Sequence, residues 1–168
     1  DGDLDLLAAS LWNKRITWYR NDGHENFDEH TIATTISLAF SASAADVDGD
    51  GDMDVLARST TGDGSSWYEN DGSQNFTAHT ITTSADGAYS VYAADVDGDG
   101  DMDVLGVAGG NTENKVTWYE NGNGWAEYKI SSFLPNYYVQ LASVHAVDID
   151  GDTDMDVLAS GAQPFSSP

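Results

Sequence analysis

The sequence predicts an all-β fold made of repeated, small antiparallel sheets. A string of alternating aspartates occurs at residues 46–54, again at 95–103, and in a variant form at 148–156. A Trp-Tyr pair recurs with a similar spacing of about 49 residues, and no segment shows the 3.6-residue apolar period of an amphipathic helix. A repeat of about 50 residues is typical of propeller blades and similar arrays, and it argues against a single-core globule.

Each repeat is expected to contain four short strands, and the second repeat shows them most clearly. Its β-branched and aromatic runs cover residues 54–58, 66–69, 76–82 and 89–94, with Gly, Asn and Asp between them. When the strands are named a to d and the aspartate string joins a to b, the chain reads b-c-d, a-b-c-d, a-b-c-d, a-b. The prediction is a β-propeller segment of about three four-stranded antiparallel blades.

The whole chain, 1–168, is therefore interpreted as one propeller array. Its predicted repeats are 1–49, 50–98, 99–151 and a partial repeat at 152–168. Closed propellers have roughly four to eight blades. We therefore expect the chain either to be part of a longer propeller or to close by homo-oligomerisation.

The composition is strongly acidic, with a formal net charge of −23 over 168 residues and 29 acidic side chains. Most of these acids lie in the aspartate strings, so the charge is local and resembles a set of ligands more than a solvating tail. A field of this sign argues against nucleic acid and anionic membranes as partners. The absence of cysteine excludes disulfides and thiolate metal sites, and no apolar run is long enough for membrane insertion.

The aspartate strings are interpreted as calcium loops. Five carboxylates within nine residues repel one another unless a hard cation lies among them, and calcium takes six to eight oxygen ligands. An EF-hand is excluded because its twelfth position requires glutamate, whereas Ala57, Gly106 and Ala159 stand there.

The pattern Asp-x-Asp-x-Asp-Gly-x-x-Asp resembles the calcium loops of FG-GAP and VCBS repeats, the propeller family that includes the integrin α-subunit head. The recurring Trp-Tyr-Glu-Asn-(Asp)-Gly strengthens the resemblance, and the absence of Phe-Gly and Gly-Ala-Pro places the chain nearer the bacterial VCBS-like branch. The resemblance implies side-chain ligands at loop positions 1, 3, 5 and 9 and a backbone carbonyl ligand at position 7. The implied sites are Asp46, Asp48, Asp50, Asp52 and Asp54; Asp95, Asp97, Asp99, Asp101 and Asp103; and Asp148, Asp150, Asp152, Asp154 and Asp156.

The sixth loop position predicts a difference among these sites. Gly51 and Gly100 occupy this position in the first two loops, where a positive φ is expected, and Thr153 occupies it in the third. A β-branched residue at positive φ costs on the order of 1–3 kcal/mol, so we expect the third site to be the weakest. The string Asp1, Asp3, Asp5 is only half a site and is expected to bind nothing unless a partner chain completes it.

Aromatic residues and histidines recur in register. Trp18, Trp67 and Trp118 lie mid-strand; they suit stacking on sugars, but packing between neighbouring blades is the favoured interpretation. His30 and His79 occupy equivalent positions of the first two repeats, and Tyr128 stands there in the third. A catalytic residue would not be exchanged in this way between repeats. The sequence contains no nucleophile, phosphate-loop or paired-carboxylate motif, so we expect the protein not to be an enzyme.

The loops at the opposite end from the aspartate strings share little sequence, which is typical of a recognition surface in repeat proteins. Asn111, Tyr137 and Tyr138 are candidate ligand contacts, although simple loop drift explains them as well. We expect a non-enzymatic, calcium-stabilised module that binds or adheres to protein or carbohydrate, outside the cell or at its surface, where calcium is plentiful. The alternative is a non-catalytic scaffold portion of a larger secreted enzyme that acts on polysaccharides.

Overall fold

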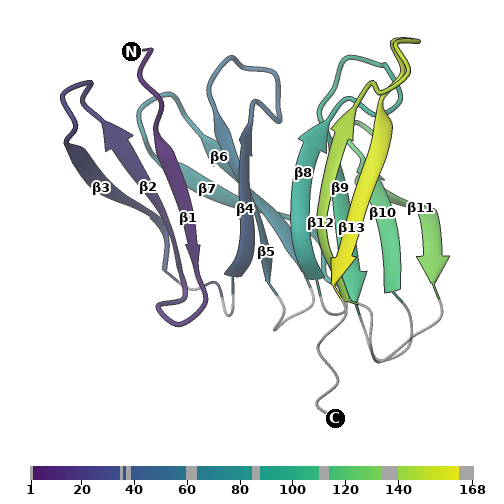
Figure 1. The fold of residues 1–168 in the computed structure, drawn as a ribbon. Helices are drawn as coiled ribbons and strands as arrows, with labels where there is room; N and C mark the ends of the chain where they lie inside the picture. Colours follow the sequence, from purple (N-terminus) through teal and green to yellow (C-terminus); the bar gives the residue numbers. More distant parts are fainter. Residues whose placement is uncertain are drawn as a thin grey trace.

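The computed structural model describes residues 2–34, 36, 39–59, 64–84, 88–109, 114–133 and 140–162. Within these residues the chain forms four antiparallel sheets that stand side by side in a fan (Figure 1). The candidate contacts Asn111, Tyr137 and Tyr138, and the first residue Asp1, lie outside the described residues. No described helix is long and apolar enough to cross a membrane.

The strand order matches the predicted b-c-d, a-b-c-d, a-b-c-d, a-b. The first sheet contains β1 (Leu6–Ser10), β2 (Arg15–Asn21) and β3 (Phe27–Ala33). The second contains β4 (Ala39–Ala45), β5 (Asp54–Ser59), β6 (Ser65–Asn70) and β7 (Phe76–Thr82). The third contains β8 (Ala88–Ala94), β9 (Asp103–Gly109), β10 (Asn114–Glu120) and β11 (Ala126–Phe133), and the fourth contains β12 (Gln140–Val147) and β13 (Asp156–Ala162).

Neighbouring strands pair in chain order because short polar turns reverse the chain between them. The turn from β6 to β7 is an example: the Asp71 carboxylate accepts the backbone N–H of Ser73 at 2.9 Å and of Asn75 at 3.1 Å. Gly72 adopts φ 73° in this turn, where a residue without a side chain is least strained. The expected break between these two strands is therefore a turn at Asn70-Asp71-Gly72, where Asn, Asp and Gly interrupt the strand pattern.

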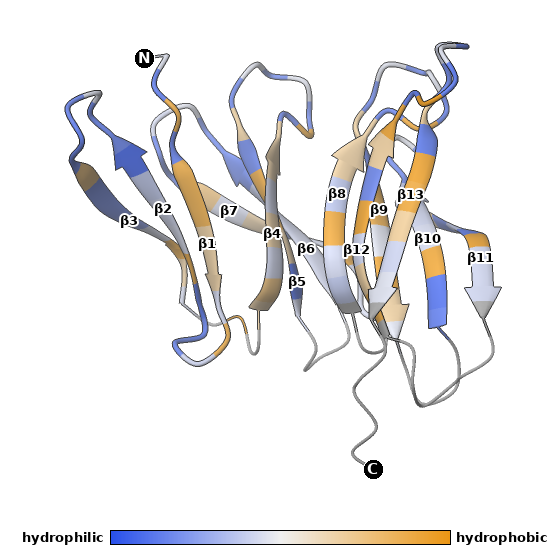
Figure 2. Cartoon of the chain, in the orientation of Figure 1, coloured by the Kyte–Doolittle hydropathy of each residue, from blue (hydrophilic) through white to orange (hydrophobic). Residues whose placement is uncertain are grey.

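The core lies between the sheets, because alternate residues of a strand face opposite neighbours. Tyr68 packs with Val55 against the first sheet, and Trp67 packs with Leu56 against the third. Trp67 and Tyr68 are each 8% exposed. Figure 2 shows hydrophobic bands along the strands and mostly hydrophilic connections at the end that carries the acidic loops. The prediction that the Trp-Tyr pairs pack between blades is confirmed for Trp67 and Tyr68.

One buried charge interrupts this apolar packing. Arg58 is fully buried, and its Nη1 donates to the carbonyls of Ser90 at 3.2 Å and Val107 at 3.4 Å in the third sheet. Burial lowers the pKa of Arg58, and the neighbouring Tyr119 opposes that shift. The guanidinium fits because Gly106 has no side chain; a Cβ there would collide with it. Arg58 therefore links the second and third sheets, a contact that the sequence analysis did not predict.

Candidate metal centres

The three complete aspartate strings form loops at the same end of the sheets (Figure 1). Each loop joins the first strand of a sheet to the second: β4 to β5, β8 to β9, and β12 to β13. At the sixth position φ is 97° at Gly51, 99° at Gly100 and 80° at Thr153. The predicted positive φ is therefore present in all three loops, including the one where a β-branched residue must adopt it.

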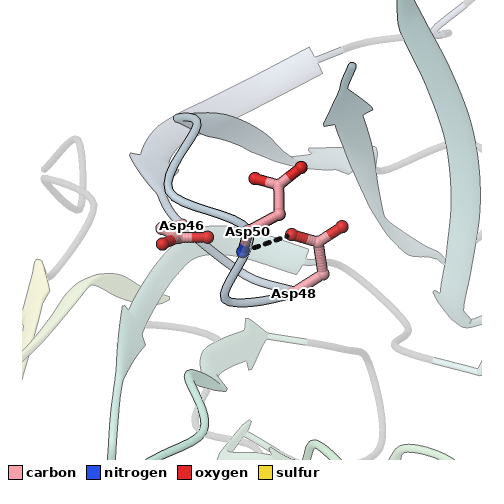
Figure 3. Close-up of side chains that lie close together, drawn as sticks. All are labelled: Asp46, Asp48 and Asp50. Atoms are coloured by element: carbon pink, nitrogen blue, oxygen red, sulfur yellow. Dashed lines mark hydrogen bonds between the residues drawn. The ribbon is translucent and has the colours of Figure 1, made fainter. Parts of the chain in front are cut away.

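The acids at positions 1, 3 and 5 come together in the first two loops. Asp46, Asp48 and Asp50 each bring one carboxylate oxygen to within 4.8 Å of the other two. Figure 3 shows these three side chains projecting from a single turn of the loop. The same arrangement occurs at Asp95, Asp97 and Asp99. Such a group of oxygen donors could hold a metal ion.

Backbone N–H groups hold the first loop in this conformation. Gly51 N donates to Asp46 Oδ2 at 3.1 Å, Asp50 N to Asp48 Oδ1 at 3.2 Å, and Asp52 N to Asp50 Oδ1 at 2.9 Å. Asp46 Oδ1, in contrast, is a buried oxygen without a hydrogen-bond partner. An unpaired buried acceptor is costly unless a cation or water satisfies it. This oxygen therefore fits a metal ligand.

The ninth-position acids of the first two loops have a different environment. Asp54 is completely buried; its Oδ2 accepts the N–H of Val47 at 2.9 Å and its Oδ1 accepts the N–H of Asn70 at 2.8 Å. Asp103 is 1% exposed and accepts the equivalent N–H groups of Val96 and Asn121. Burial is the main cause that raises the pKa of both carboxyl groups. These two acids lie outside the gathered triads and tie the loop to the third strand of its sheet.

The seventh-position side chains also point away from the triads. Asp52 Oδ2 lies 2.5 Å from where a Cβ of Gly72 would be, in the turn between β6 and β7. Asp101 approaches Gly122 in the corresponding turn of the third sheet. This placement agrees with the expectation that position 7 does not bind through its carboxylate. Whether its carbonyl binds an ion stays a prediction.

The sequence analysis did not identify an asparagine that supports the half-string and the first two complete acidic loops. Asn21 and Asn70 are the last residues of β2 and β6, and Asn121 directly follows β10. Their Nδ2 atoms donate to the carbonyl of loop position 8: to Leu4 O at 3.2 Å, Met53 O at 3.3 Å and Met102 O at 3.2 Å. The signal was present, because an asparagine follows Trp-Tyr-x in each of these repeats.

The third loop gathers a different set of acids. Here Asp148 and Asp150 are joined by Asp156, the ninth residue, and Asp152 is not part of the group. The described part of this sheet has two strands, so no third strand with its asparagine lies beside β13. The expectation that this site is the weakest stays a prediction.

The half-string at the start of the chain forms no such group among the described residues. Asp5 Oδ2 accepts the indole N–H of Trp18 at 2.8 Å, and Asp5 Oδ1 accepts the N–H of Asn21 at 2.8 Å. Asp3 lies against Gly23, as Asp52 lies against Gly72. The described half-string thus repeats the supporting contacts of a loop without the gathered acids.

The repeated histidines are packing residues. His79 stacks on Trp67 with ring centroids 4.6 Å apart, and its Nε2 lies 2.6 Å from Glu69 Oε2. In the third sheet Tyr128 stacks on Trp118 at 4.7 Å and donates its hydroxyl proton to Glu120 at 2.7 Å. Since His and Tyr fill the same position with the same contacts, the site suits cross-strand packing better than catalysis.

Comparison with known proteins agrees with this geometry. A family model described as an FG-GAP-like repeat matches residues 1–57 and 58–106. No curated protein matches the chain. The two matched segments cover the first and second sheets, β8 and the beginning of β9. The chain therefore belongs to the FG-GAP-like repeat family.

Proposed function

We propose that this chain is a non-enzymatic, calcium-stabilised propeller module that binds protein or carbohydrate outside the cell or at its surface. The observation that supports it is the gathering of acids in loops at equivalent positions of successive sheets. A catalytic centre needs one such constellation, whereas structural ions recur with the repeat. Their role is to neutralise the acids and to hold each loop between its first two strands.

Calcium suits these groups better than other ions. The gathered donors are carboxylate oxygens, without histidine or cysteine, which favours a hard cation over zinc or copper. Calcium accepts irregular shells of six to eight oxygens, whereas magnesium demands near-ideal octahedral geometry. Asp46, Asp48 and Asp50 would hold the ion in the first loop, and Asp95, Asp97 and Asp99 in the second. Affinities of about 10⁻⁴–10⁻³ M are typical of extracellular modules and match a calcium-rich setting.

The opposite end of the sheets is the proposed recognition surface. The first strand of each four-stranded sheet carries a β-bulge there, at Phe40 in β4 and Tyr89 in β8. A bulge re-aims its side chain, and the two rings meet edge to face with centroids 5.6 Å apart. Phe40 remains 46% exposed. A partly exposed aromatic pair suits stacking on a sugar ring or an apolar protein side chain.

The calcium half of the proposal is tested by thermal melting in millimolar calcium, in millimolar magnesium and in excess chelator. Calcium is expected to raise the melting temperature, since each site contributes about 1.4 kcal/mol at tenfold saturation. Asp48→Asn should lose part of this gain, and the matched control Glu25→Gln, which removes an exposed acid outside the loops, should keep it. Equal stabilisation by magnesium would contradict the choice of ion, and no metal effect would contradict the sites themselves.

The binding half is tested on arrays of glycans and of extracellular proteins, in calcium and in chelator. Calcium-dependent binding that Phe40→Ser abolishes, without a change in melting temperature, is the expected result. Absence of binding on both arrays would leave a calcium-stabilised scaffold and would refute the recognition surface.

A further inference from the structure

One side-chain amide connects the first two complete acidic loops. Asn121 follows β10 in the third sheet, and its Nδ2 donates to two carbonyl oxygens: Val47 O at 2.8 Å and Met102 O at 3.2 Å. Val47 is the second residue of the loop at 46–54, between the strands β4 and β5 of the second sheet. Met102 is the eighth residue of the loop at 95–103, in the third sheet. One asparagine therefore holds the backbone of two candidate metal centres in neighbouring sheets.

The amide group of Asn121 is suited to such a bridge. An asparagine Nδ2 has two hydrogens, one for each carbonyl. Its Oδ1 accepts the N–H of Gly122 at 2.9 Å, which fixes the orientation of the amide plane. The main-chain N–H of Asn121 is also used, since it donates to Asp103 Oδ1 at 2.9 Å. Because the side chain and the main chain of Asn121 are both held, a shift of one carbonyl must move the other or break a hydrogen bond.

Both carbonyls lie beside expected ligands of the ion. Val47 stands between Asp46 and Asp48, which belong to the gathered acids of the first loop. Met102 directly follows Asp101, whose carbonyl is an expected ligand in the second loop. A change in the position of either carbonyl therefore changes the position of a neighbouring ligand.

The packing around Val47 makes the connection between the loops stiff. Val47 is 2% exposed and belongs to the core between the second and third sheets, where Val104 of β9 is completely buried. Its N–H donates to Asp54 Oδ2 at 2.9 Å. Densely packed side chains and hydrogen bonds transmit a displacement from one element to the next. Val47 is held in both ways, so ordering of the first loop reaches the third sheet.

We propose that Asn121 couples these two metal centres, so that a calcium ion bound in either loop raises the affinity of the other loop. This inference rests on the proposed calcium sites. In an ion-free loop the acids repel one another, and the backbone must be ordered when the ion binds. An ion in the first loop fixes the Val47 carbonyl and, through Asn121, the Met102 carbonyl. Binding of the second ion then loses less conformational entropy, and the effect is the same in both directions because the two sites share one coupling free energy.

Charge effects between the two loops predict the opposite sign of coupling. A bound calcium ion neutralises acids of its own loop and therefore weakens the attraction of the neighbouring loop for a second cation. Electrostatic repulsion alone thus gives weaker binding of the second ion, whereas the Asn121 bridge gives tighter binding. The sign of the coupling distinguishes the two effects.

The test is a calcium titration of the 168-residue chain followed by NMR. The amide signals of Gly51 and Gly100 report the two loops separately, because their N–H groups donate to Asp46 Oδ2 and Asp95 Oδ2. Asp97→Asn removes a carboxylate from the second loop, and it should weaken calcium binding at the first loop by about fivefold or more.

The matched control is Asp150→Asn, the same change at the same position of the third loop. It should leave the calcium affinity of the first loop unchanged, because β8 of the third sheet packs between β4 and β12 and separates the two loops. An equal effect of Asp150→Asn and Asp97→Asn would overturn the proposal, since it would show a general effect of charge or stability.

Asn121→Ala separates the bridge from a merely structural role. In this background Asp97→Asn should no longer weaken the first loop, so the coupling disappears from the double-mutant cycle. Asn70→Ala removes the equivalent support of the Met53 carbonyl in the first loop. It should weaken that loop and keep the coupling. If Asn121 were only structural, its replacement would lower both affinities and the coupling would survive.

The outcomes separate this inference from the proposed function. Calcium binding at both loops without coupling, or with weaker binding of the second ion, would overturn the bridge and leave the calcium sites intact. If the Gly51 and Gly100 signals do not respond to calcium, the sites are refuted and the coupling falls with them. The comparison of the parent chain with Asp97→Asn decides the sign of the coupling even if Asn121→Ala fails to fold.

Discussion

The loops at 95–103 and 148–156 have nearly the same sequence but gather different acids. In the first, Asp103 stays out of the triad because Val96 and Asn121 occupy its two oxygens. In the second, Asp156 accepts the N–H of Ile149, no third strand lies beside β13 in the described residues, and this aspartate joins the group. The ninth aspartate is thus held by the neighbouring strand in one loop and gathered with the other acids in the other.

The largest expected difference between the loops is in the contribution of this ninth residue to stability. Asp103→Asn turns an amide N–H₂ toward a buried backbone N–H, and we expect a loss of about 3 kcal/mol in the free energy of unfolding. Asp156→Asn should cost less than about 1 kcal/mol. Urea denaturation in excess chelator measures both without a metal contribution. Equal costs would contradict the strand-dependent role.

Exchanging the residues at the sixth position of these two loops is expected to have an intermediate effect on stability. Thr153 holds φ 80° and Gly100 φ 99°, so Thr153→Gly should stabilise the protein by about 1 kcal/mol and Gly100→Thr should destabilise it by about 1–3 kcal/mol. Calcium titration by calorimetry should show tighter binding at the third loop after Thr153→Gly. If both exchanges leave stability unchanged, strain at this position does not distinguish the loops.

The smallest expected effect is on the pH dependence of stability, which should run in opposite directions in chelator and in calcium. Burial raises the pKa of Asp54 and Asp103 in the ion-free fold, so between the ordinary and the raised pKa the folded state binds more protons than the unfolded state. Stability in chelator should therefore increase as the pH falls from the raised pKa toward the ordinary one. In calcium, protons compete with the ion for the carboxylates, and stability should fall over the same range. Melting curves that shift in the same direction in both buffers would contradict this account.

The strand order and the loop conformation could be predicted from the sequence because both depend on local, repeated signals. Alternating β-branched and aromatic residues defined the strands, and the positive φ of Thr153 followed from its alignment with Gly51 and Gly100. Packing of the Trp-Tyr pairs between sheets followed from their mid-strand position. These features depend on signals that are local in the chain and recur from one repeat to the next.

The contacts that could not be predicted join residues of different strands or sheets. The position of Asp54 in the loop suggested a metal ligand, yet its burial between Val47 and Asn70 depends on how β6 lies beside the loop. The sequence analysis assigned no role to Arg58, which contacts the third sheet at Val107, 49 residues away in the chain. Single-sequence periodicity contains no information about such distant pairs.

The buried Arg58 restricts which repeat can follow the second one. In a freshly duplicated array every unit fits after every other, and shuffled copies would fold equally well. Here Arg58 needs glycine at the facing position, and only the following repeat has Gly106 there, where the second and fourth repeats have Ala57 and Ala159. The methyl group of alanine at this position thus distinguishes the other repeats from the third one, which alone can face the arginine. Recombination that exchanged these repeats would place a methyl group against the buried arginine and destabilise the fold. The order of the repeats is therefore constrained.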